Sequence, residues 1–187
     1  VAITDMPQMV ALFNGMGGGS AAGIGAMELV RWSAAGQSPG MVPGVLAVLG
    51  SLIGAVSLTG SVIAWAKLDG RMDKRYTFPG QQWFNAAIAI AAVVCGAMAL
   101  QTLAMPWIVA FFVLALALGV LMTLPIGGAD MPVVISLYNA FTGLAVAFEG
   151  YVLGNEALII AGTMVGAAGM LLTRLMAKAM NRKISNV

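Results

Sequence analysis

The sequence contains no histidine, one cysteine and few charges, since only 9% of its 187 residues are Asp, Glu, Lys or Arg. The lack of histidine removes the commonest metal ligand and the usual proton carrier near neutral pH. Cys95 has no partner for a disulfide within the chain, and we interpret it as a small packing residue. A net charge of +2, without a basic and aromatic stripe, argues against nucleic-acid binding.

Apolar residues dominate what remains, because 60% of the chain is hydrophobic. Ordinary soluble domains carry roughly 25% charged residues, so this chain lacks the side chains needed for a polar surface. Lipid is the solvent that tolerates such a composition. The 24 glycines fit the same environment, because small residues let membrane helices pack closely. The predicted fold class is therefore all-α, a polytopic transmembrane helix bundle.

Six apolar stretches reach the length of about 20 residues that spans a bilayer. They predict six spans in one domain over residues 1–187, at about 6–30, 42–66, 84–103, 106–124, 131–153 and 156–177. Lys and Arg concentrate in the loop between the second and third stretches and in the C-terminal tail. Six spans place that loop and the tail on one side, so the positive-inside rule predicts that both termini are cytoplasmic.

An internal repeat links the first and fifth stretches. Residues 5–14 read DMPQMVALFN and residues 130–139 read DMPVVISLYN. Each copy opens with an aspartate in the N-cap position and a first-turn proline. Because the first and fifth of six spans run in the same direction, this is a parallel repeat. Asn14 and Asn139 follow their aspartates by nine residues, which is roughly 13–14 Å along a helix and close to the membrane midplane.

Ser136 and Thr142 stand three residues either side of Asn139, which predicts a polar stripe on one helix face. Such a stripe must avoid lipid. One interpretation is interhelical hydrogen bonding that holds the bundle together. The other is a hydrated proton or ion path, with Asn139, Ser136, Thr142 and Asn14 as its candidate residues.

Other motifs are less specific. Glu149 lies inside the fifth stretch and is a functional candidate, although it could also reach the nearby interface. The run at 15–20, GMGGGS, follows no strand and lacks GK[ST], so it is not a phosphate loop. Gly50 and Gly54 predict a helix-packing face. No catalytic pair, nucleophile–base set or metal cluster is evident, so we expect the chain to bind no nucleotide, cofactor or metal by itself.

Four segments resemble the membrane domain of the beta subunit of proton-translocating nicotinamide nucleotide transhydrogenase. They are TDMPQMVALFNGMGGGSAA, AKLDGRMDKRYTFPGQ, GADMPVVISLYNAFTGLAVAFEGYVLGN and LMAKAMNRKISNV. The resemblance covers essentially the whole chain. It implies an enzyme complex of the bacterial inner membrane that couples hydride transfer between NAD(H) and NADP(H) to proton movement.

The resemblance also implies partners. Soluble domains would bind NAD(H) and NADP(H), alpha-subunit helices would complete the membrane domain, and the protomers would form a homodimer. We expect the chain to be a piece of a longer beta subunit. Further helices would precede it and the NADP(H)-binding domain would follow it.

Residue by residue, Asp130 matches the family's aspartate at the cytoplasmic end of the fifth helix, and Asn139 matches its mid-membrane asparagine. Arg182 matches the basic hinge to the NADP(H) domain. We expect Asp130 and Arg182 to approach each other, with Lys178 as the competing partner. Asn14 stands where some members have a histidine. Because asparagine does not titrate, water or an alpha-subunit histidine would have to carry the proton there.

Two other functions stay open at this point. The parallel repeat also suits the core of an ion-coupled secondary transporter. A scaffolding membrane subunit that conducts nothing is the third alternative.

Overall fold

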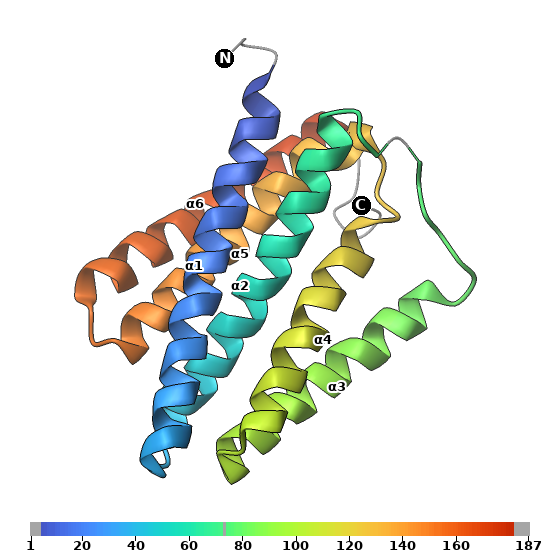
Figure 1. Ribbon diagram of the computed structural model, residues 1–187. Helices are drawn as coiled ribbons and strands as arrows, with labels where there is room; N and C mark the ends of the chain where they lie inside the picture. The colour runs from blue at the N-terminus through green and yellow to red at the C-terminus, as the bar shows by residue number, and fades with distance from the viewer. Residues whose placement is uncertain (1–4, 73, 182–187) are drawn as a thin grey trace.

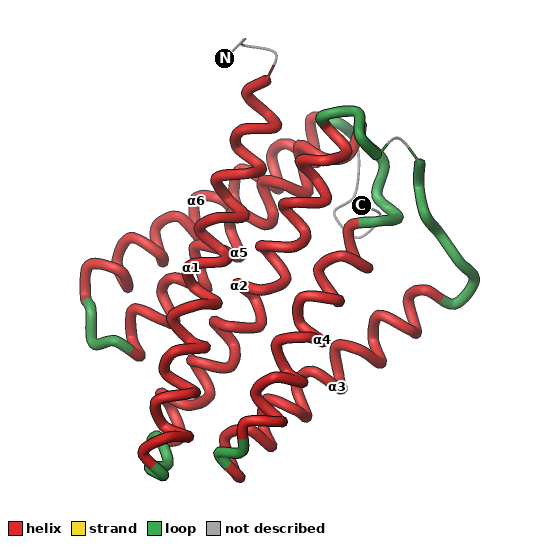
Figure 2. Tube along the Cα trace, in the orientation of Figure 1, coloured by secondary structure: helices red, strands yellow, loops and turns green. Residues whose placement is uncertain are grey.

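The computed structural model describes residues 5–72 and 74–181, and all regular structure in these two ranges is helical (Figures 1 and 2). The α-helices and one 3₁₀ turn are α1 (Met6–Ala35), α2 (Met41–Leu68), α3 (Gln81–Thr102), α4 (Met105–Thr123), η2 (Gly128–Asp130), α5 (Met131–Val152) and α6 (Glu156–Ala179). The predicted all-α class is confirmed, and each predicted stretch corresponds to one helix with ends shifted by a few residues.

The starts of α1 and α5 match the repeat in position but differ from it in capping. Asp5 and Asp130 occupy the residue before each helix, with a proline in the first turn, as predicted. Neither aspartate makes the expected side-chain capping hydrogen bond. The reason is that both have helical backbone angles, whereas a capping residue is normally in the β region.

Five helices of the described residues, α2 to α6, are long and apolar enough to cross a membrane. The first helix, α1, has 30 residues but does not reach the same hydropathy. Its six glycines, together with Asn14, Glu28 and Arg31, dilute its apolar character. The structure therefore gives five candidate spans where the sequence predicted six.

The central helix is α2, which packs against α1, α4 and α5. The α5–α6 hairpin crosses one side of it, and the α3–α4 hairpin lies on the other (Figure 1). Helices α1 and α5 run in the same direction, as the repeat predicted. Gly17 faces Thr142, and eight residues later Gly25 faces Glu149.

Helices α1 and α2 approach each other closely through their backbones. A Cβ built on Gly54 would lie 2.6 Å from the carbonyl oxygen of Gly18 and 2.8 Å from the nitrogen of Ala22. Because these are backbone atoms, they cannot swing aside. Glycine is required here for the two helices to touch directly.

Candidate functional site

Four polar side chains meet where α1, α2 and α5 converge. Asn14 on α1 donates through Nδ2 to Ser61 Oγ at 2.8 Å and to Ser57 Oγ at 3.2 Å, both on α2. Ser57 Oγ lies 2.5 Å from Thr142 Oγ1 on α5. All four side chains are buried. We call Asn14, Ser57, Ser61 and Thr142 the amide–hydroxyl cluster.

The amide–hydroxyl cluster can relay hydrogen bonds but cannot hold a charge at neutral pH. Each hydroxyl both donates and accepts, so the direction of the Ser57–Thr142 hydrogen bond can reverse. Asn14 Oδ1 is buried without a hydrogen-bond partner among the described residues. An unmet buried acceptor is costly, so this atom is where a water molecule or another donor is best accommodated.

A second hydrogen-bonded pair continues the polar side chains toward α4. The hydroxyls of Tyr138 and Thr123 are 2.6 Å apart, and Thr123 also donates to the carbonyl of Gly119 at 2.8 Å. Because the Thr123 proton is used there, Tyr138 donates to Thr123. The backbone carbonyl of Tyr138 also lies 3.4 Å from Ser57 Oγ, which connects this pair to the amide–hydroxyl cluster.

The side chains of the predicted stripe on α5 do not face one neighbour. Ser136 accepts a hydrogen bond of 2.9 Å from Thr173 on α6, whereas Thr142 turns to Ser57 on α2. The prediction that Ser136, Asn139 and Thr142 lie on one helix face is therefore wrong for Thr142. Each residue turns an α-helix by about 100°. The six residues from 136 to 142 turn it by about 600°, so these two side chains point roughly 120° apart.

Asn139 is half-buried and makes no side-chain hydrogen bond to another described residue. It borders a groove of about 420 Å³ with Ser136, and the rest of the groove is lined by apolar residues of α1, α5 and α6. The structure thus separates the two repeat asparagines, since Asn14 belongs to the amide–hydroxyl cluster and Asn139 to this groove.

Glu149 does not reach the helix end. It is completely buried, with 0% of its surface exposed, between α5 and the glycines of α1 and α2. The interfacial position that the sequence left open is therefore excluded.

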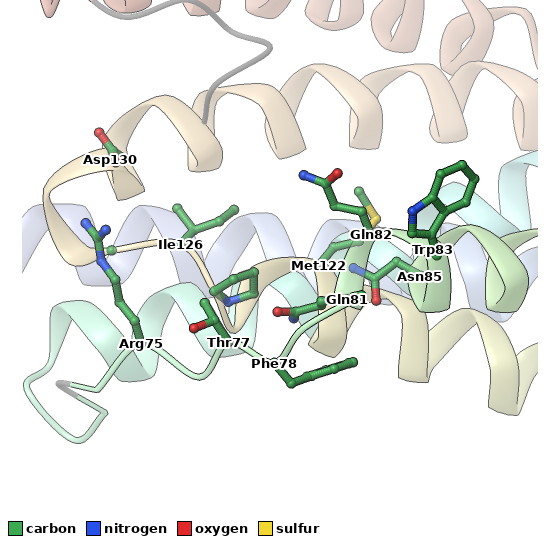
Figure 3. Close-up of a pocket in the computed structure, with 13 residues that line it drawn as sticks. Arg75, Thr77, Phe78, Gln81, Gln82, Trp83, Asn85, Met122, Ile126 and Asp130 are labelled. Atoms are coloured by element: carbon green, nitrogen blue, oxygen red, sulfur yellow. The ribbon is translucent and has the colours of Figure 1, made fainter.

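The end of the bundle carrying the α2–α3 loop holds a cavity of about 640 Å³ (Figure 3). Arg75 and Asp130 both border it, and the Arg75 guanidinium lies against Gly127. Asp130 is buried. Arg182 lies outside the described residues, so its approach to Asp130 stays a prediction.

Lys67 lies at this same end of the bundle and is buried. Its ammonium group donates to the carbonyls of Thr123 at 3.0 Å, Ile126 at 2.7 Å and Leu124. These are the carbonyls at and just beyond the C-terminus of α4, where a cation is favourable. The sequence alone placed Lys67 among the charges of the loop between the second and third stretches.

Sequence reasoning missed Ser57 and Ser61, although a signal was present. The small residues Gly50, Gly54, Ser57 and Ser61 follow one another at spacings of four, three and four, so they share one face of α2. The first two were interpreted as a packing face. Extending that face along the helix identifies the hydroxyls that meet Asn14.

The fold and the site together define a class, a multi-pass helical membrane protein with a polar network buried between its helices. The comparisons with known proteins identify the family. A family model described as NAD(P) transhydrogenase beta subunit matches residues 1–187. Two relatives from Rhodospirillum rubrum, both called NAD(P) transhydrogenase subunit beta, are 43% identical over 192 residues. The chain belongs to the NAD(P) transhydrogenase beta subunit family.

The match covers 100% of this chain and 41% of each Rhodospirillum rubrum relative. The chain thus spans about two fifths of the length of these relatives.

Proposed function

We propose that this chain forms a transmembrane proton pathway in an NAD(P) transhydrogenase, where proton movement is coupled to hydride transfer between NAD(H) and NADP(H). The observation that carries the proposal is the amide–hydroxyl cluster, which joins three helices inside an apolar bundle. The family relationship favours this function over an ion-coupled secondary transporter or a scaffolding subunit.

In this proposal all six helices cross the bacterial inner membrane and both termini are cytoplasmic. The length of α1 supports its inclusion, because 30 residues extend about 45 Å and a bilayer core is about 30 Å thick. Its polar residues Asn14 and Glu28 are buried against other helices, so they do not face lipid. A helix shielded in this way tolerates a lower hydropathy.

The nucleotides bind elsewhere in the complex under this proposal. Soluble NAD(H)- and NADP(H)-binding domains carry out hydride transfer, and alpha-subunit helices and a second protomer complete the membrane part. Asp130, at the cavity of Figure 3, and Arg182 relay the state of the NADP(H) domain to the helices. The burial of Asp130 supports this role, because a buried carboxylate responds strongly to a nearby charge.

The asparagines act as organisers of hydrogen bonds. Asn14 holds Ser57 and Ser61, and its unmet Oδ1 accepts a donor such as a water molecule. Asn139 offers its amide to the groove between α1 and α6. Neither amide takes up a proton, so water or a titratable group of the alpha subunit moves the proton past them.

The test uses the complete transhydrogenase complex in sealed vesicles, with proton movement and hydride transfer measured separately. Ser57→Ala removes hydrogen bonds worth about 0.5–1.5 kcal/mol each, so proton-coupled turnover should fall by about tenfold. Ser20→Ala is the matched control, because the Ser20 hydroxyl is exposed and bonds only to its own helix, at Met16. If the two variants move protons at the same rate, the cluster only holds the helices together and does not take part in proton movement.

Asn139→Leu tests the groove independently. We expect assembly of the complex to persist and proton-coupled turnover to be lost, because the leucine offers no hydrogen bond. Normal pumping by this variant would remove Asn139 from the pathway while leaving the amide–hydroxyl cluster in place.

A further inference from the structure

Glu149 is a buried acid that the proposed pathway does not yet use. Its side chain is completely buried on α5, and neither carboxyl oxygen has a hydrogen-bond partner among the described residues. A polar group in this situation costs several kcal/mol even when neutral, and far more as an unpaired charge. Its presence in a membrane helix therefore calls for a function.

The carboxyl group of Glu149 occupies a slot that glycines create. A Cβ built on Gly50 of α2 would lie 2.5 Å from Glu149 Oε1, and a Cβ on Gly25 of α1 would also lie 2.5 Å from it. Ser51 Oγ and the carbonyl oxygen of Ala47 converge on the same space beside Gly25. The slot thus contains two further oxygen atoms besides the carboxyl, and both can accept a hydrogen bond.

The route from this slot to the surface begins on α1. Glu28 is buried and close enough to act electrostatically on Glu149. Glu28 pairs with Arg31 at 2.6 Å, and the Arg31 side chain is 68% exposed. Glu149, Glu28 and Arg31 therefore connect the slot with the end of the bundle where α1 joins α2.

The route toward the amide–hydroxyl cluster is closed by contrast. Thr142 and Glu149 are seven residues apart on α5, which is about 10 Å along the helix. Across this interval α1 and α2 touch through the backbones of Gly18 and Gly54, and no water-sized gap separates them there. Glu149 and the cluster lie on opposite sides of this contact.

We propose that Glu149 is a proton-binding site of the membrane domain, loaded and emptied from the α1–α2 end of the bundle. A proton arriving from solvent passes the Glu28–Arg31 pair and forms an O–H bond with the Glu149 carboxylate. The proton leaves by the reverse step, or it crosses to the cluster when the Gly18–Gly54 contact opens. This inference rests on the proposed function, since it supplies the titratable group that the cluster lacks.

The charged groups around Glu149 are few. From α1 they are Glu28 and Arg31, whereas the groups of α2 at the slot, Gly50, Ser51 and the Ala47 carbonyl, carry no charge. On α6, the acid closest in sequence is Glu156, which is exposed beyond the α5–α6 turn. Burial acts most strongly on the proton of Glu149, and Glu28 is the charged group that acts on it.

The first experiment measures protonation directly in the complete complex. A hydrophobic carbodiimide attaches to protonated carboxyl groups buried in membranes, and mass spectrometry locates the adduct. We expect Glu149 to be modified, with a yield that falls as the pH rises and that changes when Glu28→Gln removes the neighbouring charge. An unmodified Glu149, or a yield independent of pH, would overturn the proposal.

The second experiment measures function in sealed vesicles. Glu149→Gln keeps the shape of the side chain but binds no proton, so proton-coupled turnover should fall by about 100-fold, the size of effect typical for a positioned proton-transfer group. Glu149→Asp should restore part of the rate with a shifted pH profile. Glu156→Gln is the matched control and should leave both unchanged.

The outcomes distinguish the two proposals. If the wild-type complex pumps protons and Glu149→Gln pumps equally with the same pH profile, Glu149 is a packing residue and this inference fails. If the wild-type complex moves no protons, the proposed function fails, while the carbodiimide yield still reports whether Glu149 binds a proton.

Discussion

Replacing Gly18 with alanine puts a methyl group 2.9 Å from the carbonyl oxygen of Gly54 and 2.9 Å from Cβ of Ser57. Carbon atoms normally approach other heavy atoms to about 3.5–4.0 Å, so α1 and α2 must separate by several tenths of an ångström or more. Overpacking of this kind costs about 1–3 kcal/mol. The displaced Ser57 also weakens its hydrogen bonds with Asn14 and Thr142.

Gly23→Ala is the control for this change. Gly23 lies on the same helix, and a Cβ there meets nothing within 4 Å. Both substitutions gain the same helix propensity of about 0.8–1.0 kcal/mol, so their difference isolates the clash at Gly54. The free energy of unfolding of the detergent-solubilised complex should be about 1–3 kcal/mol lower for Gly18→Ala than for Gly23→Ala. Equal stabilities, within roughly 0.5 kcal/mol, would refute the direct backbone contact.

Three further predictions concern the α2–α3 end and its connections. Lys67→Met should lower the free energy of unfolding by about 1.5–3 kcal/mol, because it removes the charged donor to carbonyls at the end of α4, whereas Lys74→Met at an exposed site should have little effect. Tyr138→Phe should cost about 0.5–1.5 kcal/mol in the same measurement, since one buried hydrogen bond is lost. Neutralising Asp130 and Arg182 together should restore more coupling than either single change, and strictly additive defects in the double-mutant cycle would rule out direct pairing.

The repeat DMP-x6-N shows how far a sequence pattern extends into three dimensions. It correctly predicted that α1 and α5 run in the same direction, because a parallel repeat follows from the order and number of the helices. It did not predict that the two asparagines have different surroundings. Asn14 meets the hydroxyls of α2, whereas Asn139 faces a groove toward α6. Equal positions in two similar helices meet different neighbours when each helix packs in a different place.

Glu149 shows the same limit for a single residue. Its position in an apolar stretch marked it as a functional candidate, but the sequence was also compatible with a side chain that reached the interface. The burial of its carboxyl depends on Gly25 and Gly50, which are far from it in sequence. Only the packing of three helices could bring these residues together.

The sequence by itself determined the helical class, the approximate helix ends and the lipid environment, because these follow from the length and hydropathy of continuous segments. The tertiary structure alone decided which polar side chains meet, since helix rotation and crossing set that choice. Ser57 bonds to Asn14, which is 43 positions away in the sequence, and to Thr142, which is 85 positions away. Hydropathy averages over a helix and carries no direction, whereas a hydrogen bond forms only between side chains that point at each other.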